Sequence, residues 1–443
     1  MTAGNTSPRT ERTVRGMARR TPVATALHQA LGIVLGTDSL PLRIRAWDGS
    51  EAGPPGAPVV VVRSRRAIRR LVWSPGQLGL GRAYVAGEID VEGDMFATFS
   101  ALTSVGRLAE TEHVAGPSPR ERLRLLGTAV RLGAIGREPA PPPEEMPPVP
   151  RRRRHSPDRD AAAISHHYDV GNDFYQLVLG PSLVYSCAVW ADEDTGLDAA
   201  QEAKLDLVCR KLGLAPGMRL LDVGCGWGSL ALHAAQRYGV DVVGVTLSTE
   251  QAALAAKRVA EAGLTERVQI RVQDYRDVAD GPYDAISSIG MAEHVGRAQM
   301  PGYAAHLAGL LRPGGRLLNH AIAWNAGETH QDADTFIARY VFPDGELLGL
   351  GAMTTALESA DLEVLDVEAL RQHYALTLRA WVARLEEHWD EAVAASSEGR
   401  ARVWRLYMAA SALAFEAGDM GVNQVLTQRP GGAPPPLRRT AWI

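Results

Sequence analysis

The stretch that most constrains the fold reads Leu220-Leu221-Asp222-Val223-Gly224-Cys225-Gly226-Trp227-Gly228-Ser229-Leu230. Its largely apolar start, residues 218–223, predicts a buried strand, and the three alternate glycines predict a tight turn into a helix that begins near Ser229. Glycine suits such a turn because a side chain would keep the backbone from approaching a ligand, and because such turns often need positive φ. The feature alone fits either a ligand-binding turn or a purely structural connection.

The spacing of these glycines separates the turn from that of a dinucleotide-binding protein. Gly224, Gly226 and Gly228 do not follow the pattern Gly-x-Gly-x-x-Gly. The pattern Asp-x-Gly-x-Gly-x-Gly after a strand resembles instead the opening of S-adenosylmethionine-dependent methyltransferases.

Composition sets broad limits on the protein class. A chain of 443 residues suggests two or three domains, and 46% hydrophobic with 22% charged residues is typical of a soluble globular protein. The formal net charge of −4 argues against bulk attraction to nucleic acid, so an anionic partner would have to meet a local basic patch. Nearly all basic residues are arginine, since the only lysines are Lys204, Lys211 and Lys257.

Cysteine usage and hydropathy indicate the compartment. The 3 cysteines are too few and too scattered for a disulfide framework or a zinc site. No apolar run reaches transmembrane length, and the N-terminus lacks a hydrophobic signal core. We therefore expect a cytoplasmic protein.

The first part of the chain predicts a tail, a small domain and a linker. Residues 1–20 are polar and arginine-dotted, which favours disorder, and residues 21–137 predict a small mixed domain. Its expected pieces are strands at 42–47 and 59–63, a short helix at 64–72, a strand within 87–94 and a basic amphipathic helix at 120–137. Residues 138–160 are rich in proline and arginine, which predicts a linker.

The basic helix and the run Arg151–Arg154 have two interpretations. Such arginines usually form a solvated surface. They also could hold an anionic membrane surface, at about 1 kcal/mol per residue near the lipid. The residues alone leave both interpretations open.

Residues 161–443 predict a doubly wound α/β domain with C-terminal helical additions. Strands are expected at 219–223, 240–245, 268–272, 283–288 and 315–323, and helices at 229–238, 249–262 and 300–311. After residue 342 the pattern is helical, notably at 376–395 and 400–417, and these helices are expected to cover the site.

Ligands of such a sheet lie beyond the carboxyl ends of its strands, which selects the polar residues found there. The second strand ends near Thr246 and Gln251, where a typical methyltransferase would carry a ribose-binding acid. After the third strand, Asp274 could accept from the adenine amino group and Tyr275 could flank the ring. The fourth strand is followed by Glu293 and by His294, which competes with it for a catalytic role.

Several ordered motifs carry a family resemblance. They are His166 to Tyr175, Tyr185-Ser186-Cys187, Asp222 to Gly228, Val245 to Gln251 and Gly290 to Gly296. This set, from about residue 161 to 381, resembles the cyclopropane-fatty-acyl-phospholipid synthase family, which includes the mycolic acid cyclopropane synthases. The resemblance implies a class I methyltransferase fold. It also implies transfer of a methyl group from S-adenosylmethionine to a cis double bond of a phospholipid acyl chain, through a carbocation.

The resemblance also implies the site residues. The cofactor-binding residues would be Tyr185, Ser186, Asp222, Gly224, Gly226, Thr246, Gln251, Asp274 and Tyr275. A bicarbonate ion would act as the base, held by Cys187, Glu293, His320, the main chain of Ile322, and Tyr374, with no metal required. His167 and Tyr168 would shape a lid over the cofactor.

Each of these residues has a plainer interpretation. Cys187 alone would be a small buried side chain, Tyr374 a core residue of a helix, and His294 a structural neighbour of Glu293. Only the motif set raises them above these interpretations.

The product and the partners follow from the same resemblance. Loss of a proton from the transferred methyl closes a cyclopropane, whereas a prior hydride shift gives a 10-methylene chain for a partner reductase. The segments 185–190 and 339–347 look closer to actinobacterial 10-methylene synthases of the tuberculostearic acid pathway.

A phospholipid substrate favours peripheral docking of the N-terminal domain on an anionic membrane at its inner face, and a homodimer is also consistent with the family. The rival hypotheses are a small-molecule O- or N-methyltransferase and a non-catalytic lipid-binding protein.

Overall fold

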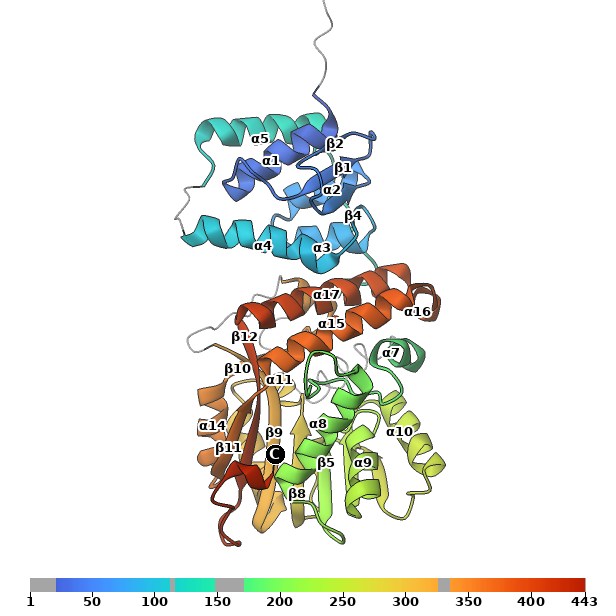
Figure 1. The fold of residues 1–443 in the computed structure, drawn as a ribbon, viewed down its shortest axis with the longest axis vertical. Helices are drawn as coiled ribbons and strands as arrows, with labels where there is room; N and C mark the ends of the chain where they lie inside the picture. The colour runs from blue at the N-terminus through green and yellow to red at the C-terminus, as the bar shows by residue number, and fades with distance from the viewer. Residues whose placement is uncertain (1–20, 112–115, 148–170, 326–334, 443) are drawn as a thin grey trace, which may run out of the picture.

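The computed structural model describes residues 21–111, 116–147, 171–325 and 335–442. The expected tail 1–20, the run Arg151–Arg154 and the pair His167 and Tyr168 lie outside these ranges. The described chain forms an N-terminal lobe and a larger lobe built on one sheet, shown in Figure 1. None of the described helices is long and apolar enough to cross a membrane.

The N-terminal lobe packs helices on a small sheet whose strand order is β2-β1-β3-β4. Alternate side chains of β1 point into a core shared with the apolar faces of α1, α2 and α5. The strands are β1 (Arg43–Ala46), β2 (Glu51–Ala52), β3 (Val59–Val62) and β4 (Ile89–Glu92), and the helices are α1 (Val23–Leu35), α2 (Arg65–Trp73), α3 (Gln77–Val85), α4 (Met95–Thr111) and α5 (Pro119–Leu132).

The expected basic helix is confirmed as α5, but it ends five residues early. Ser118 and Glu121 form a capping box at its start, with Pro119 in the first turn. Gly133 adopts a left-handed conformation that stops the helix. The strands expected at 42–47, 59–63 and 87–94 and the helix at 64–72 are confirmed within a few residues, whereas α1, α3 and α4 were not predicted.

The larger lobe has the doubly wound topology that the sequence predicts. Its strand order is β11-β12-β9-β8-β5-β6-β7, with β10 paired beside β9, and the chain changes direction of winding between β5 and β8. The strands are β5 (Arg219–Val223), β6 (Asp241–Thr246), β7 (Val268–Val272), β8 (Tyr283–Ile289), β9 (Leu311–Trp324), β10 (Leu348–Gly349), β11 (Glu363–Ala369) and β12 (Met420–Gln428).

Helices cover both faces of this sheet and its carboxyl edge. In Figure 1, α15 and α17 cross between the sheet and the N-terminal lobe. The described helices of this lobe are α7 (Asn172–Leu179), α8 (Leu197–Leu212), α9 (Ser229–Tyr238), α10 (Thr249–Glu261), α11 (Ala292–Val295), α12 (Met300–Leu310), α13 (Phe336–Tyr340), α14 (Leu350–Glu358), α15 (Arg371–Glu387), α16 (Trp389–Ala395) and α17 (Glu398–Ala417). Short 3₁₀ turns lie at Tyr275–Asp277 and Arg439–Ala441.

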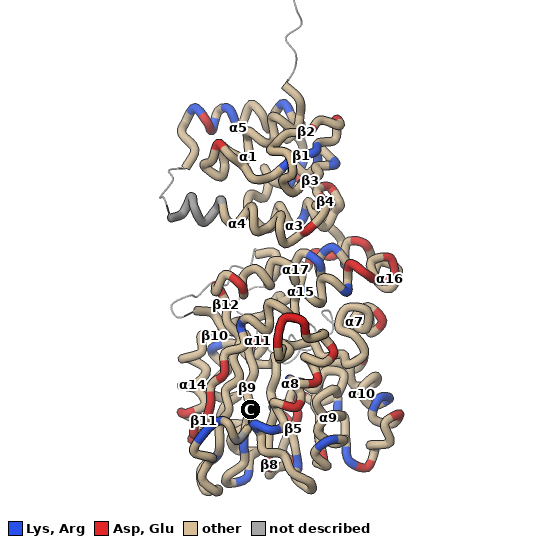
Figure 2. Tube along the Cα trace, in the orientation of Figure 1, with Lys and Arg blue, Asp and Glu red and all other residues tan. Residues whose placement is uncertain are grey.

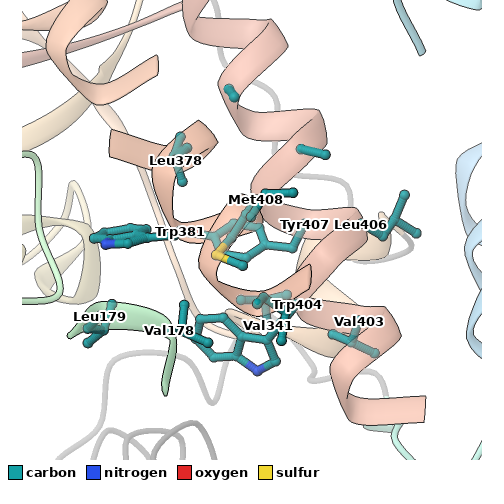
Figure 3. Close-up of a cluster of buried hydrophobic side chains, with 14 of the residues drawn as sticks. Val178, Leu179, Val341, Leu378, Trp381, Val403, Trp404, Leu406, Tyr407 and Met408 are labelled. Atoms are coloured by element: carbon teal, nitrogen blue, oxygen red, sulfur yellow. The ribbon is translucent and has the colours of Figure 1, made fainter. Parts of the chain in front are cut away.

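Aromatic packing fixes α15 and α17 over the sheet. Trp381 of α15 and Trp404 and Tyr407 of α17 are buried in one cluster with Val178 and Leu179 of α7, as Figure 3 shows. Buried aromatic side chains contribute large apolar areas, so this cluster holds the two helices firmly in place.

The helical segments expected after residue 342 are present, but the strands β10, β11 and β12 in this part of the chain were not predicted. Strand β12 pairs antiparallel with β9 along its whole length, and β11 pairs antiparallel with β12. The sequence of β12 does not indicate a buried strand, because Gln424 and Thr427 are polar residues and yet are fully buried. The helix expected at 376–395 begins at Arg371 and breaks at His388 into α15 and α16.

The segment 138–147 fastens the two lobes together. Glu145, whose side chain is 1% exposed, accepts hydrogen bonds from Arg82 Nε of α3 at 2.6 Å and from Arg339 Nη2 of α13 at 2.5 Å. Tyr340 donates its hydroxyl proton to the same carboxylate at 3.0 Å. A second ion pair joins Arg402 of α17 to Asp90 of β4 at 3.0 Å.

Candidate active site

A cavity of about 590 Å³ lies at the carboxyl ends of the strands, beneath α15 and α17. All nine residues assigned to the cofactor line it, together with Glu293, Ile322 and Tyr374 of the expected base site. Cys187 and His320 are not among its lining residues. The cavity therefore collects most of the residues that the motifs selected, from segments far apart in the chain.

The glycine turn brings backbone close to the cavity. Gly224 and Gly226 have φ values of 75° and 53°, and a Cβ at Gly224 would lie 2.6 Å from the Met291 side chain. The amides of Gly224 and Cys225 both donate to the Val245 carbonyl, at 2.9 and 3.0 Å, which ties the turn to β6. The positive φ values and the crowded Cβ position at Gly224 explain the glycines, and Gly224 and Gly226 both line the cavity.

The end of β6 is organised by a small hydrogen-bond network. Ser248 caps α10 by accepting from the Gln251 amide at 3.2 Å. Thr246 Oγ1 donates to the side-chain oxygen Oε1 of Gln251 at 2.9 Å, and this bond orients the Gln251 side chain. Gln251 lines the cavity, and its side-chain NH₂ group is available there as a donor.

Asp274 is held by an arginine that the sequence reasoning missed. Arg276 donates to it from its backbone amide at 2.9 Å and from its guanidinium at 2.8 and 2.6 Å. Burial alone would raise the pKa of Asp274, but these contacts lower it overall, so the carboxylate stays ionised. The Arg276 guanidinium also lies over the Tyr275 ring, 5.5 Å from its centroid. Asp274 and Tyr275 both line the cavity.

Lys204 is the most informative residue that the sequence reasoning did not select. It is 2% exposed, lines the cavity and donates from Nζ to Ser186 Oγ at 3.0 Å. Burial lowers its pKa to about 8, against the opposing effect of the Asp222 charge. The sequence feature that could have pointed to Lys204 is the rarity of lysine in an arginine-rich chain.

Asp222 faces the same end of the cavity. Burial raises its pKa to about 6, while a 2.7 Å hydrogen bond from Ser287 and the charge of Lys204 oppose that rise. A carboxylate and an ammonium in one buried pocket are complementary to a ligand that carries both an ammonium and a carboxylate, as the methionine part of S-adenosylmethionine does.

Glu293 lies on the short helix α11 and lines the same cavity. Its Oε1 accepts from the Ile322 amide at 2.8 Å, and its Oε2 is buried with no hydrogen-bond partner among the described residues. Burial raises the pKa of Glu293 to about 7, with the Ile322 amide opposing. Such a carboxyl can hold or release a proton near neutral pH.

The remaining expected base-site residues converge on the β9–β12 pair. Ile322 of β9 is the register partner of Val422 in β12. The Leu370 amide donates to the Val422 carbonyl at 2.8 Å, and the Cys187 thiol lies 3.6 Å from the Leu370 carbonyl. Tyr374, buried in α15, follows Leu370 by one helical turn. Burial raises the pKa of the Cys187 thiol, so it remains protonated.

His320 is neutral and oriented by its neighbour on β12. The amide nitrogen of Gln424 lies 3.3 Å from His320 Nδ1, which makes Nδ1 the acceptor and leaves the proton on Nε2. Burial and the charges of Lys204 and Lys211 lower its pKa to about 3. His320 Nε2 is buried with no partner among the described residues.

These unpaired atoms fit a small anion that can both donate and accept. Glu293 Oε2 is an acceptor and His320 Nε2 a donor, and each lacks a partner in the described part of the chain. Bicarbonate carries one hydroxyl donor and several acceptor oxygens, so its chemistry matches this donor and acceptor set. Within the described residues, no group of three His, Cys, Asp or Glu side chains is placed to hold a metal ion.

One part of the cavity wall is apolar and aromatic. The Tyr374 and Phe415 rings lie 4.8 Å apart, and Phe342 and Tyr407 meet edge to face at 5.8 Å. All four line the cavity. Aromatic faces stabilise a cation without offering it a nucleophile.

The chain is similar in sequence and in fold to several known proteins. The family model for mycolic acid cyclopropane synthetase matches residues 155–425. A probable fatty acid methyltransferase of Mycobacterium tuberculosis is 45% identical over 417 residues, covering 91% of this chain and 95% of that protein. The cyclopropane-fatty-acyl-phospholipid synthase of Escherichia coli K12 is 36% identical over 366 residues, covering 81% of this chain and 85% of the synthase. The crystal structure of mycolic acid cyclopropane synthase CmaA1 complexed with SAH and CTAB has a TM-score of 0.57 and 34% identity, covering 61% of this chain and 98% of CmaA1.

Proposed function

The chain belongs to the mycolic acid cyclopropane synthetase family of S-adenosylmethionine-dependent methyltransferases, and from that premise we propose that it methylates the cis double bond of an oleoyl-type chain in membrane phospholipid. The single observation that carries the proposal is the cavity itself. It joins a polar end at the glycine turn to an aromatic wall and a buried carboxyl at Glu293. A polar methyl donor and an apolar acceptor chain would meet between these ends.

The polar end is suited to S-adenosylmethionine. Asp222 would take the ammonium group, and Lys204 with Ser186 would take the carboxylate. Gln251 would donate to the ribose hydroxyls, and Asp274 would accept from the adenine amino group beside Tyr275. The bound cofactor supplies the methyl group.

The apolar end is suited to a poor nucleophile. An alkene that takes up a methyl cation becomes a carbocation, and the rings of Tyr374, Phe415 and Tyr407 would stabilise it without reacting. Glu293, His320, Tyr374, Cys187 and the main chain of Ile322, whose amide already donates to Glu293, would hold bicarbonate, which supplies the base for the last proton. Glu293 Oε2 would orient that ion by accepting a hydrogen bond from its hydroxyl group, and His320 Nε2 would donate to it.

The membrane interpretation of the basic helix is supported by what α5 exposes. Leu123, Leu126 and Val130 follow a helical spacing of three and four residues, and they are 72%, 62% and 53% exposed. By helical geometry, Arg122 lies on one side of this stripe and Arg120, Arg124 and Arg131 on the other. None of these four arginines forms an ion pair within the residues that the structure describes. Such a helix suits the surface of an anionic bilayer, which supports peripheral docking of the enzyme on the inner face of the membrane.

For the product, we propose a 10-methylene chain, with the cyclopropane as the alternative. The support is the likeness of segments 185–190 and 339–347 to 10-methylene synthases. A reductase would then convert the methylene group to a methyl branch.

The test is a lipid profile from cells. The chain is expressed in a host without a cyclopropane synthase, fed oleate and methyl-labelled methionine, and the fatty acids are resolved by gas chromatography–mass spectrometry. A labelled 10-methylene chain is expected, and a labelled cyclopropane would select the alternative. Glu293→Gln should remove the labelled product, while Glu358→Gln, at an exposed carboxylate of α14, should keep it. Soluble, cofactor-binding protein with no labelled lipid would contradict the proposal.

A further inference from the structure

A second apolar surface of the N-terminal lobe lies at the end of α2. Val72 and Trp73 are 50% and 52% exposed, although valine and tryptophan are usually buried. They stand next to the loop that leads into α3. Exposed apolar side chains of this size, grouped together, indicate a contact with an apolar partner.

This corner is continuous with the docking face of α5. The segment that follows α5 runs beside α2, because Arg69 Nη2 donates to the Gly133 carbonyl at 3.3 Å and a Cβ at Gly136 would lie 3.0 Å from Arg69 Cζ. Val72 and Trp73 follow Arg69 by three and four residues, so they share its face of α2. Ile135, 71% exposed, adjoins that contact. Exposed apolar residues therefore lie on either side of the Arg69 contact, with Ile135 after α5 and Val72 and Trp73 on α2, and together with the exposed α5 residues they are called the apolar strip.

The strip ends where the cavity reaches the N-terminal lobe. Gln77, the first residue of α3, is exposed and is the one described residue of this lobe that lines the cavity. Only Ser74, Pro75 and Gly76 separate it from Trp73. An acyl chain leaving the surface at Trp73 would therefore meet the cavity after a short distance.

Charge around the strip matches anionic head groups. Figure 2 shows arginine positions spread over the N-terminal lobe, including α5. Arg65 is exposed on α2, and in the described part of the chain neither Arg65 nor Arg69 forms an ion pair. An indole ring beside cations is well suited to the boundary between head groups and acyl chains.

We propose that Val72 and Trp73 insert into the acyl region of an anionic phospholipid bilayer, and that an acyl chain passes from there into the cavity beside Gln77. This inference rests on the proposed phospholipid substrate. It assigns an entry route and an insertion point, whereas α5 supplies only attachment to the surface.

Insertion is tested directly by fluorescence quenching. Vesicles of phosphatidylglycerol with brominated acyl chains quench tryptophans that reach the acyl region. We expect stronger quenching of the unaltered protein than of Trp73→Phe, because the variant has no tryptophan at position 73. Equal quenching of the two proteins would overturn insertion at Trp73.

Passage of the acyl chain from the bilayer into the cavity is tested by supplying one lipid in two forms. Oleoyl phosphatidylglycerol is offered in vesicles or carried singly by methyl-β-cyclodextrin. The double variant Val72→Ser/Trp73→Ser should lose about tenfold of its turnover on vesicles and keep its turnover on the carried lipid. The control is Val34→Ser, since Val34 is a 59% exposed valine of α1 in the same lobe, and it should behave as the unaltered protein.

The outcomes separate this inference from the proposed function. Equal loss on both presentations, or no loss on vesicles, overturns the entry route while leaving the enzyme's activity established. If the unaltered protein methylates the lipid in neither form, the proposed function fails instead. Bromolipid quenching then still reports whether Trp73 inserts.

Discussion

Replacing Glu293 with glutamine should stabilise the ligand-free protein while it removes turnover. Burial raises the pKa of Glu293 from an ordinary value of 4.5 to about 7. A pKa difference of about 2.5, at about 1.4 kcal/mol for each pKa unit, corresponds to about 3 kcal/mol. This is the free energy that the ionised carboxylate costs the folded state above pH 7.

The sign follows from proton binding. Between pH 4.5 and about pH 7, the folded protein keeps a proton on Glu293 that the unfolded chain releases. Stability therefore falls as the pH rises through this window. Glutamine is isosteric, can still accept from the Ile322 amide and never ionises, so the variant escapes this loss.

The assay is thermal unfolding at two pH values, without cofactor. At pH 8 the melting temperature of Glu293→Gln should exceed that of the unaltered protein by about 6 °C, taking about 2 °C per kcal/mol for a domain of this size. At pH 4.5 the two should nearly coincide. Glu358→Gln, at an exposed position, should match the unaltered protein at both values.

Turnover and cofactor binding complete the experiment. The variant should transfer almost no methyl groups, because its one amide oxygen stays bonded to the Ile322 amide and its NH₂ group, a donor, replaces the Oε2 acceptor that the hydroxyl of bicarbonate would need. Calorimetry should show unchanged affinity for S-adenosylmethionine. A variant that is less stable than the unaltered protein at pH 8, or that binds the cofactor poorly, would refute this account of Glu293.

Three further substitutions test other parts of the molecule. Lys204→Met should raise the KM for S-adenosylmethionine about tenfold at pH 7. The unaltered enzyme should show a rise in this KM above the pKa of Lys204, about 8, and the variant should lack that rise. Glu145→Gln should lower the stability of the protein by about 3 kcal/mol in a melting experiment, because it leaves two arginines at the lobe interface without their buried carboxylate; Glu138→Gln, at a side chain that is 52% exposed, should change it little. Gly224→Ala should abolish cofactor binding in calorimetry, since its φ of 75° and crowded Cβ position exclude a side chain, whereas Gly302→Ala on α12 should bind normally.

The elements that the sequence predicted best are those with local signals. Strand β5 and helix α9 have the predicted bounds, because an apolar run and a set of glycines define both ends of the turn between them. Strand β12 was missed because its polar residues find their partners only after folding. Gln424 meets His320, and Thr427 Oγ1 donates to the Leu317 carbonyl at 3.2 Å, both on β9, about a hundred residues earlier.

The site was predicted in the same uneven way. Residues within motifs, such as Asp222 and Glu293, could be selected because the motif fixes their place at a strand end. Lys204 stands on a helix with no motif spacing, and its burial is created by Asp222 and Ser186 from other segments. No periodicity in α8 distinguishes a lysine that lines a cavity from one that points to solvent.

The direction of the pKa changes around the cavity bears on the substrate class. Burial raises the pKa of Glu293 to about 7 and of Asp222 to about 6, and it lowers that of Lys204 to about 8 and of His320 to about 3. All four groups are moved towards their neutral forms, whereas Asp274 stays ionised beside Arg276, so the ligand-free cavity solvates a charge poorly where no charged partner is bonded to it. A small polar molecule methylated on oxygen or nitrogen would lose its own hydration in such a place and find few partners. An acyl chain has no hydration to lose, and the cation formed on it would lie among the aromatic rings. The same property therefore favours a lipid alkene over a polar acceptor.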